Sequence, residues 1–510
     1  MKHLKRFLSS LIALALCLSL VPSALAADDM AEEANLVFYV MGDAPTDEVM
    51  VEDAINAILK EKFNATIDFQ FSTWTDFNLK YNNMLVSGGA DMIYIANWLD
   101  YGLLARSGAF LELDDLLNEY APELRALAGE DMLNMCRVDG ELYAVPALWA
   151  EYVPLGIKYR EDLRAKYDLP YPNTLENMEA YFAGIQANEP DQTILRVTGT
   201  ESASSMQVGF DTAYMMNIKY PWVTGNGFPY GLAANYDTPS DVYDYWFSDD
   251  FVEDMKLMKK WADMGFWSKS ALSDVNDSEA YNNGLAVAEV AGMNPNKQIS
   301  SATEFAKNHP EWESAYIAYG ETTGVLFPGH ATQNGTAIVR GSKYPERCAM
   351  VLNYIMTNED MYDLVQYGIR GYHYDVVEGV YQPLEANEGF KYENFNTWNL
   401  RVNEFKLMQE SDVALQTMFD KYNEIASKTK FPNVNIYDGF TEDYSEYEFE
   451  RTAVSNVMRQ YLAPLQAGLV DDVDAAVAEF REKLTAAGLQ ACRDGFTEQW
   501  LAYCEEYNYQ

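Results

Sequence analysis

Near its start the chain alternates short apolar stretches with amphipathic ones, an order that restricts the fold more than any other feature. Residues 35–41 (NLVFYVM) are typical of a buried strand, and in residues 47–62 Val51, Ile55 and Leu59 share one side of a helix. The alternation continues through a strand at 66–71, a helix at 75–86 and a strand at 92–96. Because short strand–helix–strand crossovers are right-handed, we expect the three strands to form a parallel sheet.

Open parallel sheets bind ligands in the loops at the carboxyl ends of their strands. Two of the three loops, residues 72–76 (STWTD) and 97–101 (NWLDY), place a tryptophan close to an aspartate. An aromatic ring can cover the apolar face of a sugar, while a carboxylate accepts hydrogen bonds from its hydroxyls. Taken singly, each tryptophan could equally be a packing residue, since tryptophan is commonly buried. Their shared placement predicts a ligand site that contains Trp74, Trp98, Asp100 and Tyr101.

A second informative stretch runs over residues 336–374. TAIV at its start is typical of a strand, and Pro345 suits the first turn of the helix that follows. Leu352, Ile355 and Met356 supply the apolar side of that helix. A second helix then stops at two glycines, in YGIRGYHY.

This stretch resembles the extracellular solute-binding proteins of ABC importers. In that family a strand, SKNPERA, a helix with NYI and a second helix ending in YGIEGKHY follow the second passage between two lobes. Here the residues are SKYPERCAMVLNYI and YGIRGYHY, in which Arg370 and Tyr372 replace the usual acid and lysine. The further blocks GAFLELDDLL, VDGELYAVP, FWSKSALS and SNVMRQYLAPL spread the resemblance over nearly the whole chain. It is strongest to the sugar-uptake branch with a LipO-like C-terminal region.

The resemblance implies an α/β fold of the periplasmic-binding-protein type (type II). Two lobes, each a mainly parallel sheet flanked by helices, would enclose a ligand cleft and be joined by crossings near 147–155 and 328–335. The expected organisation is a signal peptide at 1–26, lobe one at 27–148, lobe two at 149–332, a return to lobe one at 333–372, and a helical region at 373–510 that packs mainly on lobe two.

The resemblance also adds ligand candidates beyond the first sheet. Trp149 and Glu151 lie near the first crossing, in PALWAEYVPLG. Asn294 lies in a turn that faces the cleft in the family, although it could equally be a plain turn asparagine. Trp398 and Arg401 are candidates by resemblance only, and a stacked surface pair is the alternative.

The first 26 residues are typical of a secretory signal. Lys2, Lys5 and Arg6 precede a largely apolar run, and Ala24-Leu25-Ala26 forms a small-x-small cleavage site, so we expect an exported protein that starts at residue 27. Cys17 could carry a lipid instead, but its apolar neighbours are unsuited to lipoprotein cleavage and the later site is better. No other stretch approaches the ~20 apolar residues of a membrane span.

Charge excludes one class of partner. The chain has 36 basic and 78 acidic residues, and loss of three bases with the signal leaves 33 against 78, a net charge of −45. Because such an acidic surface repels phosphate backbones, we expect no nucleic-acid partner. The resemblance implies instead a small-molecule ligand, a sugar or oligosaccharide, and membrane permease subunits served by a separate ATPase. We expect a monomer without cofactor.

The sequence favours binding over catalysis. His309, His330 and His373 are scattered, no metal-type spacing is present, and neither GxSxG nor GxxxxGK[ST] occurs. A glycosidase needs only two carboxylates, so an exported glycan-active enzyme, a hydrolase or lyase, is the alternative. The long helical insertions are unlike the eight successive units of a barrel enzyme. We therefore predict no catalytic or metal-ligating residues.

Overall fold

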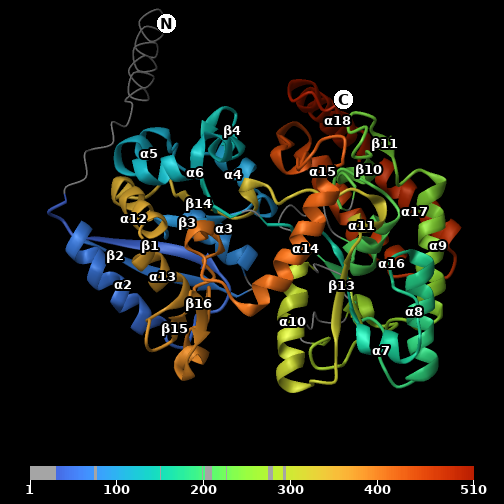
Figure 1. Cartoon of the computed structure of the whole chain (residues 1–510). Helices are drawn as coiled ribbons and strands as arrows, with labels where there is room; N and C mark the ends of the chain where they lie inside the picture. Colours follow the sequence, from blue (N-terminus) through green and yellow to red (C-terminus); the bar gives the residue numbers. More distant parts are fainter. Residues whose placement is uncertain are drawn as a thin grey trace, which may run out of the picture.

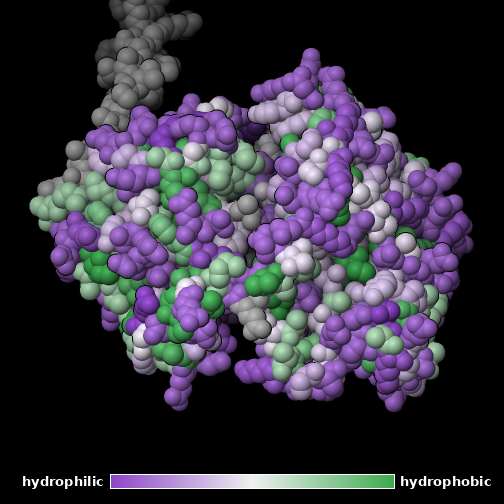
Figure 2. Space-filling model, in the orientation of Figure 1, coloured by the Kyte–Doolittle hydropathy of each residue, from purple (hydrophilic) through white to green (hydrophobic). Residues whose placement is uncertain are grey.

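A computed structural model describes residues 30–73, 77–149, 151–197, 199–200, 209–225, 227–273, 280–290 and 294–510. Two α/β lobes lie side by side (Figure 1). Their outer surface is mostly hydrophilic, and a furrow separates them on the face shown in Figure 2. No helix in the described ranges combines the length and apolar character needed to cross a membrane.

Lobe one contains the predicted parallel sheet. Strand β1 (Ala34–Met41) pairs in parallel with β2 (Ala65–Ser72) and β3 (Met92–Ile95), and the crossovers are α2 (Glu48–Phe63) and α3 (Phe77–Ser87). The sheet order is β2-β1-β3-β14-β6. Strand β14 (Gly335–Ile338) runs antiparallel between β3 and β6 (Val145–Pro146). The prediction that TAIV rejoins the first sheet is therefore confirmed.

The SKYPER motif anchors the end of α2. Helix α12 (Pro345–Thr357) begins at Pro345, and the fully buried Arg347 donates to the carbonyls of Phe63 and Asn64 at 2.7 and 2.9 Å. The last carbonyls of a helix lack intrahelical donors, and a cation there also offsets the negative end of the helix dipole. The motif thus joins two helices that are distant in sequence. The other large helices of this lobe are α5 (Asp114–Tyr120), α6 (Pro122–Met135) and α13 (Glu359–Tyr367).

The sheet of lobe two is antiparallel. Strand β7 (Gly156–Arg160) lies between β12 (Ala288–Glu289) and β13 (Ser314–Ala318), and both neighbours run opposite to it. The expectation of a mainly parallel sheet is wrong for this lobe, because β7 and β12 are separated by a long insertion instead of a single crossover helix. Helix α9 (Asp249–Asp263) buries Phe251, Met255, Met258 and Trp261, which recur at helical spacing. The remaining helices here are α7 (Glu161–Lys166), α8 (Leu175–Asn188) and α10 (Pro295–Asn308).

The C-terminal region divides between the lobes. Its first part, with strands β15 (Tyr374–Val377) and β16 (Val380–Pro383), packs into the core of lobe one as far as Val402. A third connection then leads to lobe two, where α14 (Glu410–Ala426) packs against Tyr152. The later helices complete the lobe-two core: α15 (Glu448–Val457), the π-helical turn η11 (Met458–Leu462), α16 (Ala463–Gln466), α17 (Val473–Ala486) and α18 (Leu489–Glu506).

Short elements fill the connections. They are η1 (Asn97–Leu99), α4 (Tyr101–Arg106), β4 (Arg137–Val138), β5 (Glu141–Leu142), β8 (Gly199–Thr200), β9 (Gly209–Phe210), η2 (Asp211–Ile218), η3 (Pro229–Gly231), β10 (Leu232–Ala233), β11 (Tyr243–Asp244), η4 (Ala271–Ser273), α11 (Gly320–Thr323), η5 (Ala331–Gln333), η6 (Glu385–Gly389), η7 (Trp398–Leu400), η8 (Asn403–Phe405), η9 (Tyr437–Gly439) and η10 (Ser445–Tyr447).

Candidate functional site

A cavity of about 280 Å³ lies between the lobes. Lobe one contributes the turn from β3 through η1 into α4, with Asn97, Trp98 and Asp100. Lobe two contributes the loops around Trp222 and Tyr245 and the segment 437–444. The cavity therefore lies at the carboxyl end of the first sheet, where the strand pattern predicted a ligand site.

The lobe-one wall follows from one sharp turn. Asp100 adopts a left-handed conformation (φ 58°), which lets η1 end and α4 begin with only this residue between them. Burial raises the pKa of the Asp100 carboxyl, and the positive charge of Arg451 opposes this shift. Trp98 is half-buried with its ring 6.1 Å from that of Tyr94. Tyr101 reaches the cavity, but it is only 3% exposed and its hydroxyl donates to the carbonyl of Cys136 at 2.5 Å.

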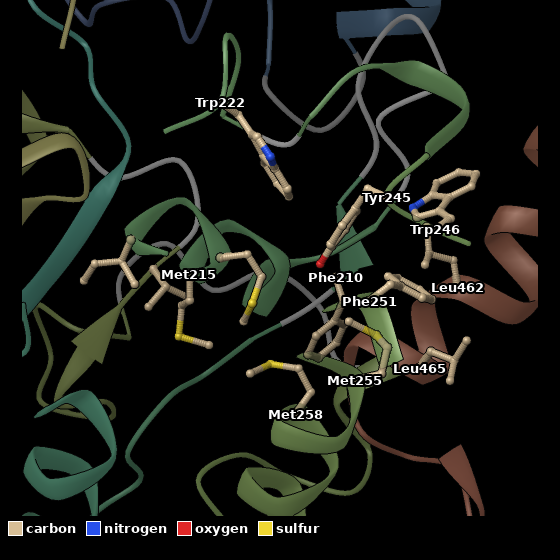
Figure 3. Packing of buried hydrophobic residues seen from close by; sticks show 14 of the residues in the cluster. Phe210, Met215, Trp222, Tyr245, Trp246, Phe251, Met255, Met258, Leu462 and Leu465 are labelled. Atoms are coloured by element: carbon tan, nitrogen blue, oxygen red, sulfur yellow. The ribbon is translucent and has the colours of Figure 1, made fainter. Parts of the chain in front are cut away.

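The lobe-two wall is aromatic. Figure 3 shows Trp222 and Tyr245 pointing into the same space, with their ring centroids 4.9 Å apart. The Trp222 ring also stacks on Tyr220 at 4.6 Å. Gly231, at φ 71°, brings the loop against Trp246, since an added Cβ would lie 2.0 Å from the indole. These rings form a rigid apolar surface beside the cavity.

Segment 437–444 (YDGFTEDY) adds polar groups to the lobe-two side. Asp438 accepts a hydrogen bond from the side chain of Asn435 at 2.7 Å. Burial raises the Asp438 pKa to about 6, although hydrogen bonds from Asn435 and from Asn97 of lobe one lower it. Burial also raises the pKa of Glu442, which accepts from Tyr230 at 2.6 Å and Tyr447 at 2.8 Å.

Glu151 and Arg401, both predicted ligand residues, bind each other instead of lining the cavity. Arg401 donates to Glu151 at 3.1 Å and to Glu393 at 2.8 Å, and all three side chains are largely buried. The adjacent backbone joins two crossings, because Leu148 donates to the carbonyl of Arg401 at 2.7 Å. Trp149 lies beside this network, with the Arg401 guanidinium 5.3 Å from its ring. The geometry identifies a charge cluster at the lobe junction.

The other predicted residues lie apart from the cavity or outside the described ranges. Asn294 caps α10 by accepting from the backbone of Lys297 at 3.0 Å, as a turn asparagine does. Trp398 packs its edge against Tyr94 at 6.3 Å. Trp74 lies outside the described residues. Of the nine candidates, the lining residues include Trp98, Asp100 and Tyr101.

Sequence reasoning missed Trp222, Tyr245 and Asp438. The stretch GNGFPYG (residues 225–231) contributes Gly227, Phe228 and Gly231 to the cavity lining. Its density of glycine and aromatic residues was the available signal. The missed side chains come from several loops that meet only in the folded protein.

The described residues contain no cluster of three or more His, Cys, Asp or Glu side chains suited to a metal ion. His373 is fully buried, accepts from the backbone of Ile369 at 2.9 Å and lies 3.2 Å from Asp47, so it is a packing residue. His330 caps η5, and burial lowers its pKa to about 4.

Comparisons with known proteins agree with this architecture. A model of a domain of unknown function (DUF3502) matches residues 436–505. A carbohydrate ABC transporter substrate-binding protein of Streptococcus pneumoniae is 23% identical, over 93% of this chain and 92% of that protein. Lipoprotein LipO of Bacillus subtilis is 23% identical, over 62% of this chain and 63% of that protein.

Among solved structures, an N-glycan transport solute binding protein (NgtS) of Streptococcus pneumoniae matches with a TM-score of 0.71 and 20% identity, over 92% of this chain and 99% of that chain. The predicted resemblance to solute-binding proteins and the two-lobed fold are confirmed, including the likeness to LipO.

Proposed function

We propose that this chain is the extracellular solute-binding protein of an ABC importer and that it captures a carbohydrate, an oligosaccharide, between its lobes. The observation that carries the proposal is the interlobe cavity, which has aromatic rings on lobe two and carboxylates from both lobes. Two relatives support the ligand class, since one is named a carbohydrate substrate-binding protein and another an N-glycan transport protein.

The lining residues match sugar chemistry. The Trp98 and Trp222 rings offer apolar surfaces for pyranose faces, and Asp100 and Asp438 accept hydrogen bonds from hydroxyls. The cavity volume, about 280 Å³, is just below the ~300–1,000 Å³ common for small-molecule sites. We infer that the cavity holds one end of the oligosaccharide while the furrow accommodates the remainder.

Transport requires that the ligand change the conformation of the protein. A sugar that contacts both walls binds the closed arrangement better, and only this difference in affinity can shift the lobes toward closure. The closed form would then deliver the sugar to the permease subunits, and a separate ATPase would supply the energy. Binding requires no bond of the sugar to break.

Export completes the proposal. Cleavage after Ala26 would remove residues 1–26, and Cys17 with them, which leaves a monomer that carries no lipid on that cysteine. The alternative is a lipid-modified Cys17, and the similarity to lipoprotein LipO is the observation that favours it. Intact-mass spectrometry of the exported protein separates the two, because a diacylglyceryl group on Cys17 would contradict the proposed cleavage.

A thermal-shift screen tests the function. The panel contains mono- and oligosaccharides, including Man5GlcNAc, the ligand of a solved NgtS complex. A sugar at 100 times its Kd should stabilise the protein by about 2.7 kcal/mol. Trp222→Ala should lose most of that shift, whereas Trp312→Ala, which lies outside the cavity lining, should keep it.

Chromatography of the sugar after long incubation tests the alternative. Recovery of unaltered ligand supports a binding protein, and its conversion to products would establish a glycan-active enzyme. A panel without any stabilising sugar would contradict the proposed ligand class.

A further inference from the structure

We propose that segment 437–444, within the domain of unknown function, is an interlobe latch that closes on helix α4, and that Gly102 is the position on α4 that admits it. The inference deepens the proposed function. It rests on that function only where it treats the cavity as a ligand site. In this proposal the C-terminal domain sets the distance between the lobe-one and lobe-two walls of the cavity.

The segment is fixed to lobe two. Gln499 of α18 donates to the Asp443 carbonyl at 2.9 Å and accepts from the Asp443 backbone N–H at 2.7 Å. Glu442 holds the hydroxyls of Tyr230 and Tyr447, as described above. The Phe440 ring packs against Trp500 at 5.3 Å. The segment must therefore move as one body with lobe two.

Its tip contacts lobe one through Thr441. Arg106, at the end of α4, donates to the Thr441 carbonyl at 2.9 Å. The same guanidinium forms a bidentate pair with Asp139, at 2.9 and 3.0 Å, which fixes its direction. Gly102, one turn earlier on α4, faces the Thr441 side chain.

The contact at Gly102 leaves no room for a side chain. A Cβ there would lie 2.1 Å from Oγ1 of Thr441 and 2.8 Å from its Cβ, so a change of rotamer would not relieve the clash. Alanine is the better helix former, by about 1 kcal/mol. Helix formation alone would thus favour alanine, and it is the approach of Thr441 that requires glycine.

The latch lies next to the ligand groups. Asp100 is two residues before Gly102 on lobe one, and Asp438 is three residues before Thr441 on lobe two. Asn97 of lobe one and Asp438 of lobe two both line the cavity, and a hydrogen bond from Asn97 lowers the Asp438 pKa. Closing the latch therefore fixes the distance between the two carboxylates, which selects the ligands that span it.

The experiment measures lobe separation without any ligand. Spin labels are placed at Val49→Cys on lobe one and Leu285→Cys on lobe two, which are 70% and 51% exposed in the native protein. The native Cys136, Cys348, Cys492 and Cys504 are buried and should escape labelling. Double electron–electron resonance then gives the distribution of distances between the two spin labels for each variant.

Gly102→Ala should move the distribution toward longer distances. Overpacking of this kind should lower the ratio of molecules with the lobes close together to molecules with the lobes apart by roughly 5- to 150-fold. Combining it with Thr441→Gly, which removes the three atoms nearest to the added methyl group, should restore the native distribution. Gly341→Ala is the matched control, because its Cβ would be 3.8 Å from the nearest atom.

The outcomes are distinct. A Gly102→Ala distribution that coincides with the native one, or a double variant that stays shifted, would overturn the latch. If Gly102→Ala does not fold, Arg106→Met, which adds no bulk, should shift the distribution in the same direction, and an unchanged distribution would again overturn it. Because no sugar is present, failure of the proposed ligand class leaves this test intact.

Discussion

Replacing Arg401 by methionine tests whether the charge cluster at the lobe junction serves stability or ligand binding. Arg401 lies between Glu151 and Glu393, and the three side chains are 14%, 8% and 8% exposed. The variant leaves two buried carboxylates without their cation. Breaking a buried pair in this way costs about 3–5 kcal/mol, mostly the penalty of the unpaired charges.

Calorimetry at neutral pH should detect this loss in the transition that unfolds lobe one. A unit of 150–250 residues loses about 2–4 °C for each kcal/mol, so the midpoint should fall by roughly 6–20 °C. Arg370→Met is the matched control, because Arg370 and its partner Asp375 are 59% and 50% exposed. Exposed pairs contribute about 0–1 kcal/mol, so the control should melt close to the native protein.

A variant without charges sharpens the test. Glu151→Gln, Glu393→Gln and Arg401→Met together remove the unpaired carboxylates, so most of the lost stability should return. A different result would refute the reasoning: if Arg401→Met melts like the Arg370→Met control but no longer binds sugar, Arg401 is a ligand residue and the cluster is not structural.

Three further outcomes are expected. Trp98→Ala should weaken sugar binding by roughly two- to twelvefold in calorimetric titration, with a smaller effect on melting than the 3–5 kcal/mol loss of a core tryptophan; unchanged affinity would contradict this. The Asp438 pKa of about 6 exceeds its unfolded value, so ionisation of Asp438 lowers the free energy of unfolding as pH rises from 4 to 6. Asp438→Asn should remove that loss. In urea unfolding, the variant should therefore gain more stability over the native protein at pH 7 than at pH 4.5. The His330 pKa of about 4 lies below its unfolded value, so the protein loses stability through this group as pH falls from 6.5 to 4. His330→Asn, which keeps an acceptor for the cap of η5, should make that decline less steep. An equally steep decline would contradict the assignment.

The sequence predicted the parts of the fold that local pattern determines. Strands β1 and β2 and helix α2 lie where periodicity placed them, because each packs apolar side chains into the core of lobe one. The direction of β7 relative to its neighbours was predicted wrongly, since pairing across a long insertion is decided by tertiary packing. For the same reason, the sequence did not indicate that residues 374–402 pack into lobe one.

The site divides in a similar way. Trp98 and Asp100 were found because the carboxyl end of a parallel strand is a general ligand position, and they line the cavity. Arg401 shows the limit, because a charged residue has the same appearance in sequence whether it meets a ligand or a carboxylate of its own chain. Trp222 and Asp438 lie more than 200 residues apart and meet only in the folded protein.

The order of strands in lobe one has a consequence for export. Strand β3 pairs with β14, and the Tyr94 side chain on β3 bonds to Asn334, 240 residues later. Lobe two likewise needs its last helices to complete its core. A chain that emerges from the membrane amino end first therefore carries an unpaired strand edge until most of its length is outside, and such edges invite association. The excess of acidic over basic residues, 78 against 36, makes neighbouring chains repel each other during that interval.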